Sequence, residues 1–153
     1  MSGMTQTAHQ PLDLGEVRRQ LRLAIEEARR AAAAHRAEVD EAGKSFEFLL
    51  EHIAGPLFRQ FTSALRAEGL LFRVITPSGA VRIEAERSAD NFLELVLDTA
   101  RHPVALLLRR RYTRGHQIFT DDRAIAEGPD LSGVTPAQLL AALMDAVTPF
   151  IER

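Results

Sequence analysis

The stretch "LRLAIEEARRAAAAHRAEVDEAGKSFEFLLEHI", residues 21–53, carries the strongest regular pattern in this chain. Apolar and small residues recur in it at alternating intervals of four and three. Such spacing places them on one face of an α-helix and matches the heptad repeat of paired helices. The pattern therefore predicts one long helix over residues 13–54. The residues on its seam are Leu21, Ile25, Ala28, Ala32, His35, Val39, Ala42, Phe46, Leu49 and Ile53.

The ends of this helix are marked by local signals. Asp13 is a good N-cap residue, and Glu16 follows it at the spacing of a capping box. Gly43 costs about 1 kcal/mol inside a helix, less than the burial of Phe46 contributes at about 1.5–3 kcal/mol, so it need not break the helix. Pro56 lacks a backbone N–H and clashes with the preceding turn. We therefore expect the helix to end or kink there, and a second helix to span residues 56–69.

The expected length of the first helix raises the question of its partner. At 1.5 Å per residue it would be about 60 Å long. A compact domain of this size has a diameter of only roughly 40 Å. Either the helix folds back near Gly43 as a hairpin, or it pairs with another chain. For the second alternative we expect a homodimer through an interface formed by Leu21, Ile25, Ala28, Ala32, His35 and Val39.

His35 is the unusual residue of the seam, because it is polar and titratable. A histidine there acts either as a polar residue that sets the register or as an imidazole lying at the edge of the seam. A buried pH switch is the functional alternative. The structural interpretation is favoured.

The chain after the second helix has the two-residue period of β-strands. Within residues 80–87, Val81, Ile83 and Ala85 alternate with charged side chains. Strands are predicted over residues 70–76, 80–87, 92–98, 104–113 and 117–120, with "SADN" at 88–91 as one of the turns. Short turns between consecutive strands indicate an antiparallel meander. Residues 121–134 look like a loop, and a helix follows from Pro136, ending before Pro149.

These elements predict an α+β fold with two N-terminal helices, the first one long, a five-stranded antiparallel meander sheet and a C-terminal helix. Residues 1–12 are expected to form a polar tail, and residues 13–153 a single domain. The 153 residues, 46% hydrophobic and 26% charged, are typical of a soluble globular domain. The absence of cysteine excludes disulfides, thiolate metal sites and a cysteine nucleophile. The sequence shows no signal peptide and no apolar run long enough to span a membrane.

Motifs for catalysis are missing as well. The sequence has no glycine-rich phosphate loop, no G-x-S-x-G elbow and no H-E-x-x-H pair. We therefore expect a cytoplasmic protein without a cofactor or a bound metal, and a non-enzymatic role is favoured over an enzymatic one. The net charge of −2 gives no overall attraction to nucleic acid or to anionic lipid.

A second stretch, "LLLRRRYTRGH" at residues 106–116, has the strongest local charge bias. It is a candidate site for an anion or a polyanion. Strand periodicity divides it, because Arg109 and Arg111 lie on one face while Arg110 lies on the other. Any site is thus expected at the hairpin tip and along one edge. The candidate binding residues are Arg109, Arg111, Arg114 and His116.

The structural alternative is that acidic neighbours neutralise these arginines. If the turn at 114–116 is tight, the next strand brings Asp121 and Asp122 back near Arg109 or near the leucines before it, with the register open by a residue or two. Glu94 on the preceding strand is expected to pair with Arg110. Cross-strand ion pairs of this kind contribute about 0.2–1 kcal/mol each.

Three functions remain open from the sequence. The leading hypothesis is a non-enzymatic, homo-oligomeric interaction module, a homodimer through its N-terminal helices, with another protein as a further candidate partner. The second is a nucleic-acid or polyanion binder using the arginine strand, with nucleic acid the less favoured partner. The third is a small-ligand pocket or active site between the sheet and the C-terminal helix, with "EGPDLSGV" at 127–134 as a lid.

Overall fold

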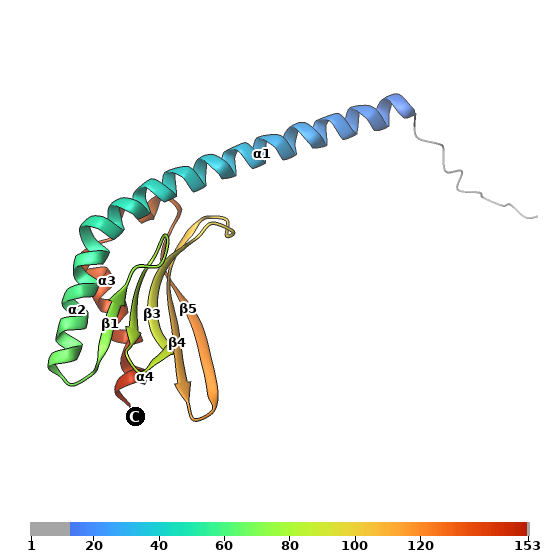
Figure 1. Ribbon diagram of the computed structural model, residues 1–153. Coiled ribbons are helices and arrows are strands. Elements are labelled where there is room, and N and C mark those ends of the chain that lie inside the picture. The colour runs from blue at the N-terminus through green and yellow to red at the C-terminus, as the bar shows by residue number, and fades with distance from the viewer. Residues whose placement is uncertain (1–12, 153) are drawn as a thin grey trace, which may run out of the picture. The chain divides into compact units, whose positions relative to one another are not determined.

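The computed structural model describes residues 13–152, and the chain has the predicted α+β fold (Figure 1). It divides into two compact units, the first ending at Arg36 and the second beginning at Ala37. The tail predicted over residues 1–12 lies outside the described residues. The elements are α1 (Leu14–Leu49), the π-helical turn η1 (Leu50–Ala54), α2 (Gly55–Ala67), β1 (Phe72–Ile75), β2 (Val81–Ala85), β3 (Ser88–Asp98), β4 (Ala105–Arg114), β5 (Gln117–Glu127), the 3-10 helix η2 (Gly128–Gly133), α3 (Pro136–Ala146) and α4 (Thr148–Ile151).

Helix α1 begins at the predicted cap and runs through Gly43 without a break. The backbone carbonyl of Asp13 accepts the N–H groups of Glu16 and Val17, both at 3.0 Å. A Cβ added at Gly43 would meet no heavy atom within 4 Å, so this glycine is not required by a neighbour. The alternative in which the helix folds back near Gly43 is therefore wrong.

The predicted end or kink at Pro56 takes the form of a π turn. The N–H of Gly55 donates to the carbonyl of Leu50, five residues earlier, and Pro56 then opens α2 without needing a donor. A Cβ added at Gly55 would lie only 2.7 Å from the Leu50 carbonyl oxygen. The helical backbone thus continues from α1 into α2, and a side chain at residue 55 would force the backbone of the turn that joins them to move.

The five strands form one antiparallel sheet in the order β1-β2-β3-β4-β5, as the meander predicts. One face of the sheet packs against α2 and α3, which lie on the same side of it in Figure 1. The space between sheet and helices is filled by large apolar side chains, since burial contributes about 1.5–3 kcal/mol for each. The largest fully buried side chains are Phe58, Ile83, Leu93, Leu95, Leu106, Leu108, Leu139 and Leu143.

Two sequence predictions in the sheet were wrong. Residues 121–127 continue β5 and are not the start of a loop, because Asp121 and Asp122 lie directly opposite Arg110 and Arg109 in the strand ladder. The remainder of the predicted loop is the 3-10 helix η2 followed by a short link to α3.

The second error is the turn predicted at "SADN", residues 88–91. The turn lies earlier, at residues 86–87, and β3 begins at Ser88. An irregularity in the β2–β3 register accommodates the polar residues. Asn91 is buried there, and its side-chain oxygen accepts the N–H of Thr113 at 2.9 Å, which replaces a backbone partner.

Candidate functional site

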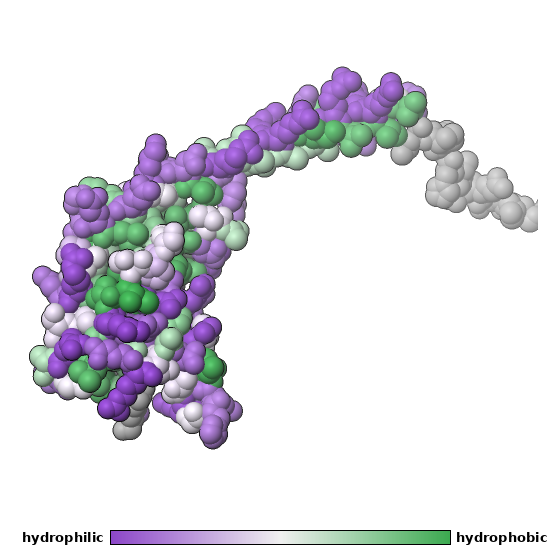
Figure 2. Space-filling model, in the orientation of Figure 1, coloured by the Kyte–Doolittle hydropathy of each residue, from purple (hydrophilic) through white to green (hydrophobic). Residues whose placement is uncertain are grey.

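Helical residues 14–36 expose an apolar stripe. Leu21 is 58% exposed and Ile25 is 40% exposed, and Ala28 and Ala32 beside them are exposed as well. Hydrophobic and hydrophilic side chains lie on different sides of this helix in Figure 2. Single exposed apolar residues are ordinary, but a continuous stripe of them marks an interaction surface. The stripe is formed by Leu14, Val17, Leu21, Ala24, Ile25, Ala28, Ala31 and Ala32.

The predicted interface residues do not all share this exposure. Val39 is half-buried and packs against the core of the second unit, and His35 is half-buried. Farther along the seam, Ala42, Phe46 and Leu49 are buried in that core. One heptad pattern thus serves two purposes, since its C-terminal half completes the core while its N-terminal half remains exposed.

The first helical segment does not need a partner in order to form. Alanine, leucine, arginine and glutamate are among the best helix formers, and they make up most of it. Near its start, the carboxylate of Glu16 lies 2.6 Å from Arg19 and accepts from Gln20 at 3.2 Å. Such pairs one turn apart support an exposed helix. Local interactions therefore explain why this segment is helical. They do not explain its exposed apolar stripe, which is the candidate functional surface.

Two of the three consecutive arginines on β4 are neutralised by β5. Arg109 makes a two-pronged contact with Asp122, with Nε and Nη2 at 2.9 and 3.3 Å from the two carboxylate oxygens. Arg110 donates from Nε to Asp121 at 3.0 Å. The hydrogen bond that Arg109 donates to Asp122 raises the pKa of Arg109. Partial burial lowers this pKa, and the negative charges of Asp122, Glu94 and Asp98 raise it further. The predicted approach of both aspartates to the arginines is confirmed.

The predicted pairing of Glu94 with Arg110 was wrong. Glu94 lies opposite Arg109 in the β3–β4 register, and its carboxylate pairs with Arg82 of β2. Arg110 points to the helix-covered face, where its Nη1 donates to the carbonyl of Ala146 at 3.3 Å. The error is one residue of register, and in a strand one residue changes the face.

The open face of the sheet carries a row of alternating charges, here called the charge ladder. It consists of Arg73, Glu84, Arg82, Glu94, Arg109 and Asp122 and crosses all five strands. Glu84 and Glu94 are only 5% and 8% exposed, although they lie on the face of the sheet opposite α2 and α3. The long arginine side chains cover them. The guanidinium of Arg82 also lies 4.0 Å from the centre of the Phe92 ring.

The remaining candidates for polyanion binding lie toward the β4–β5 turn. Arg111 is held loosely, with Nε 3.4 Å from the Thr120 hydroxyl, while Arg114 and His116 are exposed. Tyr112 and Phe119 stack with ring centres 5.2 Å apart, but strand alternation places them on the opposite face from Arg111. The aromatic ring on the same face as Arg111 is Phe92, whose centre lies 5.5 Å from the Arg111 guanidinium, and this ring is buried.

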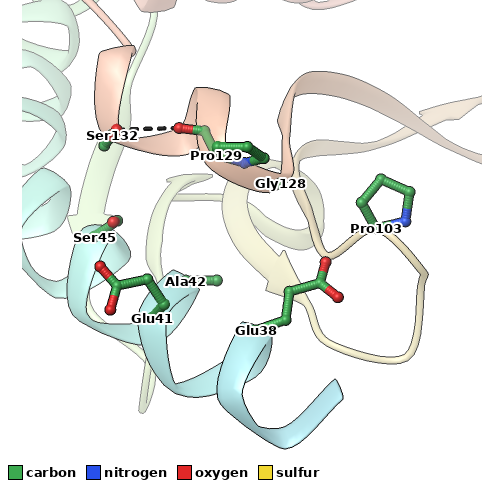
Figure 3. A pocket seen from close by; sticks show the side chains of 8 residues that line it. All are labelled: Glu38, Glu41, Ala42, Ser45, Pro103, Gly128, Pro129 and Ser132. Atoms are coloured by element: carbon green, nitrogen blue, oxygen red, sulfur yellow. Dashed lines mark hydrogen bonds between the residues drawn. The ribbon is translucent and has the colours of Figure 1, made fainter. Parts of the chain in front are cut away.

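A half-open pocket of about 330 Å³ lies between α1 and the segment that contains η2 (Figure 3). Glu38 and Glu41 stand at its rim, and their carboxylates point away from each other in Figure 3. Glu38 accepts the N–H of Val104 at 2.8 Å and lies 3.1 Å from Nδ1 of His102, so it ties the 99–104 segment to α1. The lining residues are Glu38, Glu41, Ala42, Ser45, Pro103, Gly128, Pro129 and Ser132.

The space expected to form a pocket between the sheet and the C-terminal helix is open only at its edge. A pocket of about 340 Å³ lies there, lined by Leu108, Arg110, Asp121, Asp122, Arg123, Asp145 and Ala146. The centre of this layer is filled. Leu106 and Leu108 of the sheet and Leu139 and Leu143 of α3 occupy that space and are fully buried. The segment expected to act as a lid is anchored by Leu131, which is also buried. A lid needs weak local packing, and this segment has a core residue at its centre.

No family model, no curated protein and no solved structure matches this chain. Within residues 13–152, no helix combines the length and the apolar character needed to cross a lipid bilayer.

Sequence reasoning found the exposed seam and the arginine strand but missed the charge ladder and the role of Glu38. The ladder had a signal, since Arg82, Glu84 and Glu94 occupy the same phase of neighbouring strands. Glu38 had none, because the backbone N–H that it binds belongs to Val104, 66 residues away in the chain.

Proposed function

We propose that this chain is a non-enzymatic, cytoplasmic interaction module that associates with a second copy of itself through the apolar stripe of residues 14–36. The observation that carries the proposal is the exposure of Leu21 and Ile25 on a helix whose seam is otherwise used for packing. The heptad spacing of the stripe is that of helices that pair with helices. In an alternative form of this proposal, another protein binds to the same stripe.

The small size of the stripe limits the affinity with which two copies can associate. Standard protein interfaces involve about 20–30 residues on each side. One face of a helix of this length offers fewer, so we expect a dimer that forms at micromolar concentrations rather than an obligate one. Each large apolar side chain that becomes fully buried contributes about 1.5–3 kcal/mol. A glutamate in place of one of them removes that contribution and leaves a carboxylate at the contact.

The test uses two leucines of equal exposure on different sides of the helix. Leu21 lies in the stripe and Leu23 lies outside it, and both are 58% exposed. Light scattering at tens of micromolar should give twice the monomer mass of 17.0 kDa for the wild type and for Leu23→Glu. Leu21→Glu should give the monomer mass. A monomeric wild type, or equal behaviour of the two variants, would overturn the proposal.

Polyanion binding at the β4–β5 turn is the second hypothesis, and the geometry favours it less. Asp122 and Asp121 already neutralise Arg109 and Arg110. Arg111, Arg114 and His116 would remain to carry it. Single-stranded nucleic acid is bound by arginines interleaved with exposed aromatic rings. Here Tyr112 and Phe119 lie on the other face, and Phe92, which lies beside Arg111, is buried.

A further inference from the structure

We propose that the two copies pair in an antiparallel arrangement with one defined register, in which Leu21 of one copy faces Ala32 of the other and Ile25 faces Ala28. This inference rests on the proposed function and adds the orientation of the partner. It follows from the distribution of large and small side chains along the stripe.

Large side chains occupy one part of the stripe and small ones the other. Leu21 and Ile25 come first, Ala28 and Ala32 follow them, and all four side chains are exposed. In a parallel pair, identical residues face each other. The distance between two packed helices depends on the side chains at the contact. The leucine and isoleucine layers would hold the axes apart, and the alanine layers would lose their contacts across the gap.

An antiparallel pair removes this conflict. With Leu21 facing Ala32 and Ile25 facing Ala28, every layer combines one large and one small side chain, and the axes remain at one spacing. A shift of one heptad in one direction would place Leu21 opposite Ile25. A shift in the other direction would place Ala28 opposite Ala32. The side-chain volumes therefore select one register.

In the antiparallel pair, the charged residues beside the stripe would produce both repulsion and attraction. Arg22 and Arg29 lie along one side, and the antiparallel pair would bring this side of both copies together. Exposed like charges repel weakly and are screened by salt. Glu26 of one copy would come within about 3 Å, measured along the helix axis, of the level of Arg29 of the other. This opposite charge offsets the repulsion, so packing decides the orientation.

Introduced cysteines distinguish the two orientations, and the chain has none of its own. A disulfide requires Cα atoms within about 7 Å. In the antiparallel pair the two Leu21 positions are about 16 Å apart along the axis, whereas Leu21 lies level with Ala32. Under oxidising conditions, Leu21→Cys mixed with a size-tagged Ala32→Cys copy should give the mixed disulfide, and each variant alone should give little. Self-linking of Leu21→Cys without the mixed product would overturn the antiparallel arrangement.

A spin label outside the stripe gives an independent measurement. Labels on Arg19→Cys would be separated by about 22 Å along the axis in the antiparallel pair and by none in a parallel pair. Light scattering on the same labelled sample separates the two proposals. A monomer would remove the proposed function itself, whereas a dimer with no axial separation would remove only the antiparallel arrangement.

Discussion

Because of the π turn between α1 and α2, we expect Gly→Ala substitutions at Gly43 and at Gly55 to change the free energy of unfolding in opposite directions. In an ordinary helix interior, Gly→Ala stabilises by about 0.5–1 kcal/mol. Gly43 has open space around the added methyl group, so Gly43→Ala should show this gain. At Gly55 the added Cβ would lie 2.7 Å from the Leu50 carbonyl oxygen. The backbone must move, which costs about 1–3 kcal/mol by analogy with overpacking, and it weakens the hydrogen bond that closes the turn.

We expect Gly43→Ala to raise the free energy of unfolding by about 0.5–1 kcal/mol and Gly55→Ala to lower it by about 1–3 kcal/mol. For a domain of this size each kcal/mol changes Tm by about 2–4 °C. Urea unfolding followed by far-UV circular dichroism measures both. All samples need the same protein concentration, because association changes apparent stability. A Gly55→Ala variant at least as stable as the wild type would refute the assignment of the π turn.

Three further outcomes are expected. Arg82→Ala removes the charge that covers two buried carboxylates, so it should lower the free energy of unfolding by about 3 kcal/mol. Arg109→Ala breaks an ion pair that is about 40% exposed, so it should lower the free energy of unfolding by less than about 1 kcal/mol. Equal losses for the two variants in urea titrations would contradict the charge ladder. Asn91→Ala leaves a buried backbone N–H on β4 without its acceptor, so a loss of about 1–3 kcal/mol is expected, and an unchanged midpoint would show that water replaces the side chain. If the chain binds polyanions, combined Arg111→Glu and Arg114→Glu should weaken salt-dependent binding of oligonucleotides in fluorescence anisotropy, and no binding by the wild type at low salt would end that hypothesis.

The features that the sequence predicted well depend on local periodicity. Alternation along β4 assigned Arg109 and Arg111 to one face and Arg110 to the other, and the register confirms it. The long helix followed from the seam, but the seam left open a break near Gly43, and the structure shows that the helix continues there. Such inferences need no knowledge of distant residues.

The errors arose where composition suggested a turn and tertiary contacts decided otherwise. Asp121 and Asp122 have low strand propensity, but they became strand residues because arginines lie opposite them. Asn91 is a common turn residue, yet burial against Thr113 places it inside β3. The contact of Glu38 with Val104 joins segments whose proximity no local pattern encodes.

The exposed edge strand β5 has a consequence for how copies of this chain meet. A long bare edge is a template on which foreign strands add, and this is the usual origin of fibrous aggregates. Here the centre of the strand is Asp121, Asp122 and Arg123, each held by a partner on β4 or α3. A foreign strand that paired with β5 would lie against three charged side chains that already have ion-pair partners. The charged centre of β5 therefore discourages the addition of a foreign strand at this edge of the sheet.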